Sequence, residues 1–144
     1  MSEQGLVVAH FLGAVVMATV IWFVQLVQYP LLARIGAAEF PVYAAEYQRR
    51  VGWIVIGPML LEVATAAAIT VWFPGAYRSP LFAISVGLLA VAWASTFFWQ
   101  VPLHAKLLAG HDQATIARLV TTNWLRTIAW TTRAVLLGAM IRSG

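Results

Sequence analysis

Residues 6–28 read LVVAHFLGAVVMATVIWFVQLVQ, a stretch without aspartate, glutamate, lysine or arginine. A helix of about 20 mainly apolar residues spans the hydrocarbon core of a bilayer. This stretch therefore predicts a membrane-spanning helix, which we expect to remain as a permanent first span rather than be removed as a signal peptide.

Three further stretches have the length of a spanning helix, at 51–73, 81–102 and 120–141. The chain of 144 residues is 62% hydrophobic and only 10% charged, whereas soluble domains are about half apolar and about a quarter charged. We therefore predict an all-α integral membrane four-helix bundle, a single domain over residues 1–144 with spans at about 6–28, 51–73, 81–102 and 120–141. We predict no internal repeat.

The connections between the expected spans differ in character. Residues 74–80 (PGAYRSP) predict a tight hairpin. Over residues 38–50, Phe40, Tyr43 and Tyr47 stand at helical spacing, which predicts a short amphipathic helix lying in the membrane interface with its aromatic face toward lipid. Asp112 is expected to cap the fourth helix.

Basic residues beside the spans predict the orientation. The two long connections carry Arg34, Arg49, Arg50, Lys106 and Arg118, whereas the short connection and the C-terminus carry Arg78 and Arg142. Because basic residues favour the cytoplasmic side, we expect the long connections in the cytoplasm and both termini outside, in a bacterial inner membrane.

Composition also limits the partners and cofactors. The net charge of +4 is scattered among loops and spans, so it does not indicate a nucleic-acid partner. The absence of cysteine excludes disulfides, iron–sulfur clusters and thiol catalysis. The expected partners are the lipid bilayer and a lipophilic small molecule, and a second copy of the chain or a larger membrane complex stays open.

Three charged side chains lie at depths where the hydrocarbon core of the bilayer makes a charge unfavourable. Glu62 is at the midpoint of the second span, and Arg126 and Arg133 flank the midpoint of the fourth. Each costs about 2.5–3.5 kcal/mol at the bilayer centre, so they must point into the bundle. Asn123, Arg126, Trp130 and Arg133 share one helical face. One glutamate cannot neutralise two arginines about 10 Å apart along the axis.

These groups have two interpretations. In one, Glu62 and an arginine form a buried ion pair that only fixes helix register, and the other polar groups stabilise helix association through interhelical hydrogen bonds. In the other, the polar groups line a pocket for a lipophilic aromatic or quinone-like ligand. The predicted pocket residues are Gln25, Gln28, Glu62, Gln100, Trp130 and Arg133, with His104, Asn123 and Arg126 as the candidate catalytic residues.

No metal site is predicted, because His104, His111 and Asp112 lack a diagnostic ligand spacing. No cofactor is predicted either. His10 lies near the outer end of the first span, across the membrane from His104, so the two cannot ligate one haem iron. A haem held by His10 alone stays as an alternative.

Several short motifs resemble the anthrone-oxygenase-like family of small four-span membrane proteins. They are Gln28-Tyr29-Pro30-Leu31-Leu32, Gly57-Pro58, Val101-Pro102-Leu103-His104 and Asn123-Trp124-Leu125-Arg126. After Val-Pro-Leu the family usually has asparagine, where this chain has His104. The resemblance implies a cofactor-free oxygenase that converts an anthrone to an anthraquinone. It also implies that His104 acts as the base and that Arg126 with Asn123 stabilises the enolate.

Three functions are therefore open at this point. The first is an oxygenase or oxidoreductase that acts on a lipophilic aromatic molecule in the polar pocket. The second is a haem-binding oxidoreductase that uses His10. The third is a non-catalytic subunit of a larger membrane complex or a small-ligand carrier, which the alanine-rich run at 64–68 would suit by allowing close helix contact.

Overall fold

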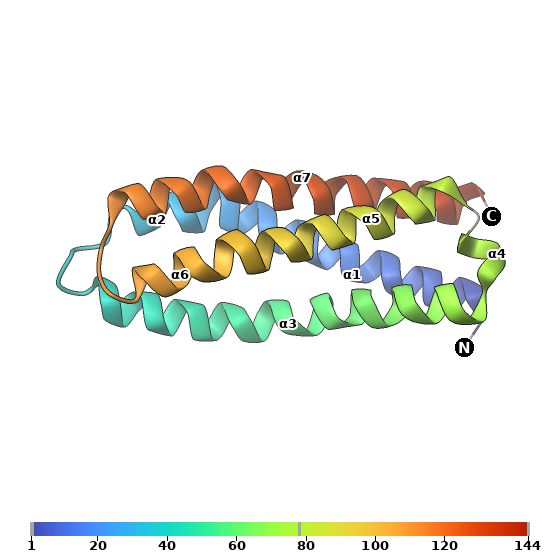
Figure 1. Cartoon of the computed structure of the whole chain (residues 1–144), viewed down its shortest axis with the longest axis horizontal. Helices are drawn as coiled ribbons and strands as arrows, with labels where there is room; N and C mark the ends of the chain where they lie inside the picture. The colour runs from blue at the N-terminus through green and yellow to red at the C-terminus, as the bar shows by residue number, and fades with distance from the viewer. Residues whose placement is uncertain (1, 78, 144) are drawn as a thin grey trace.

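A computed structural model describes residues 2–77 and 79–143. All regular structure in this part is helical, and four long rods lie side by side (Figure 1). The first rod is α1 (Glu3–Phe23), η1 (Val24–Gln28) and α2 (Tyr29–Leu32), and the second is α3 (Phe40–Trp72). The third is α5 (Pro80–Ser95), η2 (Thr96–Gln100) and α6 (Val101–Leu107), and the fourth is α7 (Gln113–Ser143). The short helix α4 (Pro74–Tyr77) joins the second rod to the third.

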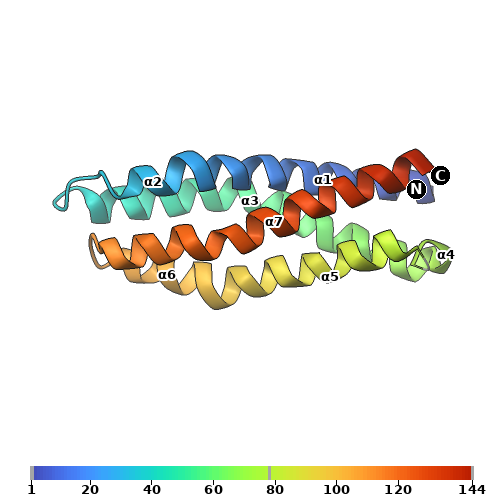
Figure 2. The same ribbon diagram turned by 90° about the horizontal axis from the view of Figure 1, so that it is seen from above.

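The rods alternate in direction. The connections at 33–39 and 108–112 lie at one end of the bundle, and α4 lies at the other end with the start of α1 and the end of α7 (Figures 1 and 2). The five basic residues that entered the orientation prediction from the long connections, Arg34, Arg49, Arg50, Lys106 and Arg118, therefore lie toward the same end of the bundle. Arg78, which entered the orientation prediction, lies outside the described residues.

Three of the rods are long and apolar enough to cross a membrane, namely Glu3–Leu32, Phe40–Trp72 and Pro80–Leu107. The fourth rod, α7, is not among them, and four arginines lie along it. Two of these arginines, Arg126 and Arg133, are buried inside the bundle. The arrangement thus confirms the expectation that the charged groups point inward.

The separate interfacial helix predicted over 38–50 is not present, and that prediction was wrong. Residues 40–50 form the first turns of α3, which continues without interruption to Trp72. No proline or loop interrupts the helix near residue 50, and Glu46 pairs with Arg49 and Arg50 along its surface. Phe40 is fully buried in the core instead of facing lipid.

Two π-helical segments interrupt the first and third rods at equivalent places. Each segment, η1 and η2, ends just before an X-Pro pair, with Pro30 after the first and Pro102 after the second. A proline lacks the backbone N–H and clashes with the carbonyl one turn earlier, and a single-turn π-bulge accommodates this without ending the helix. The third rod therefore continues past Pro102 and carries His104 on α6.

The two bulges belong to an internal repeat, so the prediction that the chain contains no repeat was wrong. Residues 28–34 (QYPLLAR) and 100–106 (QVPLHAK) agree at Gln, Pro, Leu and Ala and both end in a basic residue. The matching backbone distortions show that the similarity is structural as well as sequential. Each half of the chain thus has a bulged helix followed by a straight one.

The buried core forms three layers along the bundle. The layer near the long connections contains Tyr29, Leu32, Phe40 and Leu107, the middle layer contains Met17, Met59 and Trp130, and the third contains Leu6, Ile69, Phe82 and Leu137. In the packing, α7 lies along both α1 and α5, and α3 lies along α1. Over the described residues, α3 meets the third rod chiefly at α6. The space between α3 and the third rod is consequently the open side of the bundle.

Candidate functional site

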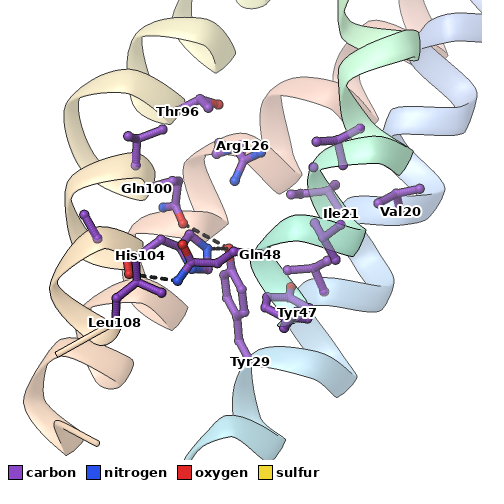
Figure 3. Close-up of a pocket in the computed structure, with 16 residues that line it drawn as sticks. Val20, Ile21, Tyr29, Tyr47, Gln48, Thr96, Gln100, His104, Leu108 and Arg126 are labelled. Atoms are coloured by element: carbon purple, nitrogen blue, oxygen red, sulfur yellow. Dashed lines mark hydrogen bonds between the residues drawn. The ribbon is translucent and has the colours of Figure 1, made fainter. Parts of the chain in front are cut away.

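A cavity of about 310 Å³ lies between α3 and the η2–α6 part of the third rod (Figure 3). Its walls are largely apolar, with Val20, Ile21 and Val24 from the first rod and Val51 and Val55 from α3. Seven polar side chains also line it: Tyr29, Tyr47, Gln48, Thr96, Gln100, His104 and Arg126. An apolar pocket with a few converging polar groups is the usual form of a small-molecule site.

The two π-bulges bring Tyr29 and His104 together. The Tyr29 hydroxyl lies 3.0 Å from His104 Nε2, and it donates a hydrogen bond of 3.2 Å to Gln100 Oε1. The Gln100 amide in turn donates to the hydroxyl of Thr122 at 2.9 Å. These residues come from three different rods, so the hydrogen-bonded chain depends on the tertiary packing. Because the Tyr29 hydroxyl gives its proton to Gln100, its oxygen accepts from His104 Nε2, and this contact orients the His104 ring.

The start of α3 forms the opposite wall. Gln48 donates a hydrogen bond of 2.9 Å to the backbone carbonyl of His104, which fixes α6 against α3. The Tyr47 ring lies 6.1 Å from the His104 ring and stacks on Tyr43 at 6.2 Å with 3° between the planes. Tyr47 and His104 therefore present aromatic surfaces to the cavity, which suits a flat ligand.

Arg126 brings a buried cation to the cavity. Its side chain reaches the cavity from α7 (Figure 3), and only 6% of the residue is exposed. Nη1 donates to Asn123 Oδ1 at 3.2 Å, and the guanidinium lies 5.2 Å from the centre of the Trp130 ring. Within the described residues, its Nε has no hydrogen-bond partner and no carboxylate pairs with it. An uncompensated buried guanidinium is unfavourable, so the site is suited to an anion.

Asn123 is held in place from behind. Its amide donates to Gln25 Oε1 at 2.8 Å, and the Gln25 amide donates to the backbone carbonyl of Val120 at 3.1 Å. Neither Asn123 nor Gln25 is among the residues that line the cavity. Both act as supports that orient Arg126, and Asn123 does not face the ligand space directly.

The second arginine belongs to a different cluster. Arg133 and Glu62 form an ion pair in which both side chains are fully buried. Trp130 Nε1 donates to the other carboxylate oxygen of Glu62 at 2.9 Å, and Arg133 Nε donates to the backbone carbonyl of Ser85 at 3.0 Å. The ion-pair interpretation thus applies to Glu62 and Arg133, and it leaves the buried Arg126 without a carboxylate partner among the described residues.

His10 is part of this second cluster, away from the cavity. Its Nδ1 lies 2.8 Å from the Thr65 hydroxyl, which itself donates to the carbonyl of Leu61. Nδ1 must therefore carry the proton, and the lone pair of Nε2 accepts from Arg133 at 3.2 Å. Ligation of a haem iron by His10 would require one of these hydrogen bonds to break.

The predicted site residues fall into three groups. The cavity contains Gln100, His104 and Arg126, the layer behind it contains Gln25 and Asn123, and the ion-pair cluster contains Glu62, Trp130 and Arg133. Gln28 joins none of these groups, because its amide points to Tyr43 at the bundle surface. Over the described residues, no group of three or more His, Asp or Glu side chains could hold a metal ion.

Sequence reasoning missed three polar residues that line the cavity: Tyr29, Tyr47 and Gln48. The repeat of Gln-X-Pro-Leu-X-Ala would have drawn attention to Tyr29, which stands beside Pro30 as Val101 stands beside Pro102. The expectation of a separate interfacial helix removed Tyr47 and Gln48 from consideration. Both residues enter the site only because α3 is one continuous helix.

No known protein family, curated protein or solved structure matches the chain. The fold and the site define its class by themselves. It is an all-helical protein with three rods long and apolar enough to cross a membrane. It contains a cavity in which a buried arginine, without a carboxylate partner in the part of the chain that the structure describes, lies beside a tyrosine–histidine pair.

Proposed function

We propose that this protein is a four-span membrane protein that binds a lipophilic aromatic or quinone-like molecule with an acidic oxygen in the cavity. The observation that carries the proposal is Arg126, a buried cation without a carboxylate partner among the described residues, on the wall of an otherwise apolar cavity. A ligand oxygen with negative charge would replace the missing counter-charge.

The same wall suits proton removal from such a ligand. His104 and Tyr29 are in hydrogen-bond contact, and no further hydrogen bond links the His104 ring to a described residue. A base near the substrate and a fixed cation near the developing oxyanion together make up the machinery for enolate formation. We therefore assign His104 as the base and Arg126 as the group that stabilises the enolate, with Asn123 positioning Arg126.

The reaction we propose is a cofactor-free oxygenation, in agreement with the resemblance to the anthrone-oxygenase-like family. His104 takes a proton from the ring methylene of an anthrone, and the electron pair moves to the carbonyl oxygen beside Arg126. Dioxygen is the oxidant. The methylene carbon becomes a carbonyl with one oxygen atom, and the second oxygen atom leaves as water with the two hydrogens of the methylene.

The fourth span in this proposal is α7. It lies along α1 and α5 over much of the bundle length (Figures 1 and 2). Two of its arginines, Arg126 and Arg133, are buried. A helix whose charges are covered by neighbours can cross a bilayer even though its own composition is less apolar. With α7 as a span, both ends of the chain lie on one side of the membrane and the long connections on the other, and we propose that the latter side is the cytoplasm.

The test uses the whole chain in lipid nanodiscs, with anthrone as substrate. Anthraquinone formation is followed by absorbance and dioxygen uptake by electrode. We expect His104→Ala and Arg126→Gln each to lower the rate at least about 100-fold, as for removal of a general base or an oxyanion donor. Arg118→Gln is the matched control, because Arg118 is exposed on the same helix, and it should keep the wild-type rate.

Helical content and thermal unfolding of each variant establish that it is folded. Wild-type rates in both His104→Ala and Arg126→Gln would refute the catalytic assignment. Failure of the wild-type protein to accelerate the reaction at all would leave a binding or carrier function, which the affinity for an ionised hydroxyquinone would then measure.

A further inference from the structure

A second hollow runs along the open side of the bundle, beyond the cavity. It lies between α3 and α5 and is lined by Val63, Ala66, Ala67, Thr70, Leu89 and Trp93, among other residues. Its lining is almost wholly apolar. Unlike the cavity it contains no charged residue, so it has no group that would hold a polar head.

The hollow and the cavity lie one after the other along the gap between α3 and the third rod, which we call the seam. On α3 the cavity residues end at Val55 and the hollow begins at Val63, with Met59 one turn from each. On the third rod, Trp93 in the hollow stands one turn before Thr96 in the cavity. From Val55 to Thr70 the seam measures roughly 22 Å, at about 1.5 Å per helical residue.

The cavity alone is small for a lipophilic ligand. Its volume of about 310 Å³ is at the lower end of the range for ligand pockets, which is roughly 300–1,000 Å³. It can enclose a ring system, but it has no room for a long substituent. A chain attached to the ring would have to leave along the seam.

Trp93 gives a second indication that the seam has an occupant. Its Nε1 is buried and has no hydrogen-bond partner among the described residues, and its ring lies 5.4 Å from that of Phe97. A buried N–H without an acceptor is unfavourable. Because Trp93 lines the hollow, an acceptor atom on a ligand that reaches this N–H would satisfy it.

We propose that the ligand of this site is an amphiphile, with an acidic ring in the cavity beside Arg126 and a single hydrocarbon chain in the hollow between α3 and α5. This inference rests on the proposed function, because the cavity must first accept the ring. It narrows the ligand class from aromatic molecules in general to those with one long alkyl or isoprenoid chain. The small side chains Ala66, Ala67 and Ala90 leave the space that the chain fills.

The experiment compares two probes that share a ring. One is 2-hydroxy-1,4-naphthoquinone, and the other is the same compound with an undecyl chain at position 3. Affinities are measured for the full-length protein in nanodiscs, and each value is corrected for partition of the probe into protein-free nanodiscs. We expect the undecyl probe to bind more than ten-fold tighter than the chainless one.

Two matched variants locate the hydrocarbon chain of the ligand. Ala67→Trp fills the hollow, and we expect it to weaken the undecyl probe at least ten-fold while the chainless probe is unaffected. Ala64→Trp places the same indole on an exposed part of α3 outside the hollow, and it should change neither affinity.

The outcomes separate the two proposals. If neither probe binds the wild-type protein, both the proposed function and this inference are overturned. If the chainless probe binds but the chain adds no affinity, or if Ala67→Trp leaves the undecyl probe unaffected, the hollow is occupied only by ordinary bilayer lipid. This inference then fails while the proposed function stands.

Discussion

The guanidinium of Arg126 lies 5.2 Å from the centre of the Trp130 ring, and the indole N–H of Trp130 donates to Glu62. One aromatic side chain therefore connects the ligand cavity to the buried ion-pair cluster. Its face stabilises a cation that has no carboxylate partner among the described residues, and its edge stabilises a carboxylate that already pairs with Arg133.

The two contributions of Trp130 can be separated by substitution. Trp130→Phe keeps an aromatic face but removes the donor to Glu62, and we expect a loss of about 1.5–3 kcal/mol in the free energy of unfolding. Trp130→Leu also removes the cation–π contact and should lower the free energy of unfolding by a further ~0.5–2 kcal/mol. Denaturation in mixed micelles measures both, and equal losses in the two variants would argue against the cation–π contribution.

The Glu62–Arg133 pair should behave as a unit. Glu62→Gln or Arg133→Met alone leaves one buried charge uncompensated and is expected to cost about 3–5 kcal/mol. The double variant removes both charges, so its loss should be well below the sum of the single losses. A double-mutant cycle on the free energy of unfolding measures this coupling, and strictly additive losses would show that the pair does not interact.

Gly13 allows the Glu62 side chain to cross the interface between α1 and α3. A Cβ at this position would lie 2.9 Å from Glu62 Cγ, which is closer than two carbon atoms approach without strain. We expect Gly13→Ala to lower the free energy of unfolding by about 1–3 kcal/mol through overpacking. Gly87→Ala is the control, because nothing lies within 4 Å of its added Cβ. A loss of similar size in the control would contradict this explanation.

The start of α7 should be sensitive to acid. The hydroxyl of Thr115 and the ammonium of Lys106 donate to Asp112, which lowers the pKa of its carboxyl group from 3.8 to about 2. The backbone N–H of Ala114 also donates to it at 3.1 Å, as expected for an N-cap. Because the pKa is lower in the folded state, this stabilisation is present above about pH 4 and is lost as the pH falls toward 2.

Hydrogen exchange of the first turn of α7 between pH 2 and pH 6 measures this effect. After correction for the intrinsic exchange rates, protection should decrease in acid. Asp112→Asn keeps a capping side chain but cannot titrate, so its protection should not depend on pH in that window. An equal acid dependence in Asp112→Asn would assign the effect to another group.

Much of the fold could be predicted because it depends on local properties of the chain. Apolar runs of sufficient length predicted three rods that could cross a membrane, and a fourth helix was predicted at 120–141 where α7 lies. The spacing of Asn123, Arg126, Trp130 and Arg133 predicted a common buried face. Asp112 was correctly expected to cap α7. The interfacial helix was wrong because an amphipathic segment without a helix-breaking residue continues the helix that follows it.

The site was predicted less completely, because side chains from different rods meet only after packing. Depth in the membrane put Gln25, Gln28, Gln100, His104, Asn123 and Arg126 in one group, of which the structure places three, Gln100, His104 and Arg126, on the wall of one cavity. It could not show that Asn123 and Gln25 lie behind the cavity or that Gln28 faces Tyr43. Rotation about each helix axis decides these placements, and a π-bulge changes that rotation in a way that spacing rules for regular helices do not include.

The sequence by itself determined that three charged groups must be inside the bundle and that one glutamate could not satisfy two arginines, since burial of charge in an apolar medium is too costly to allow otherwise. Only the tertiary structure decided which arginine received the carboxylate. Packing of α3 against α1 brings Glu62 to Arg133. The opening between α3 and the third rod leaves Arg126 on the wall of a cavity, beside Tyr29 and His104.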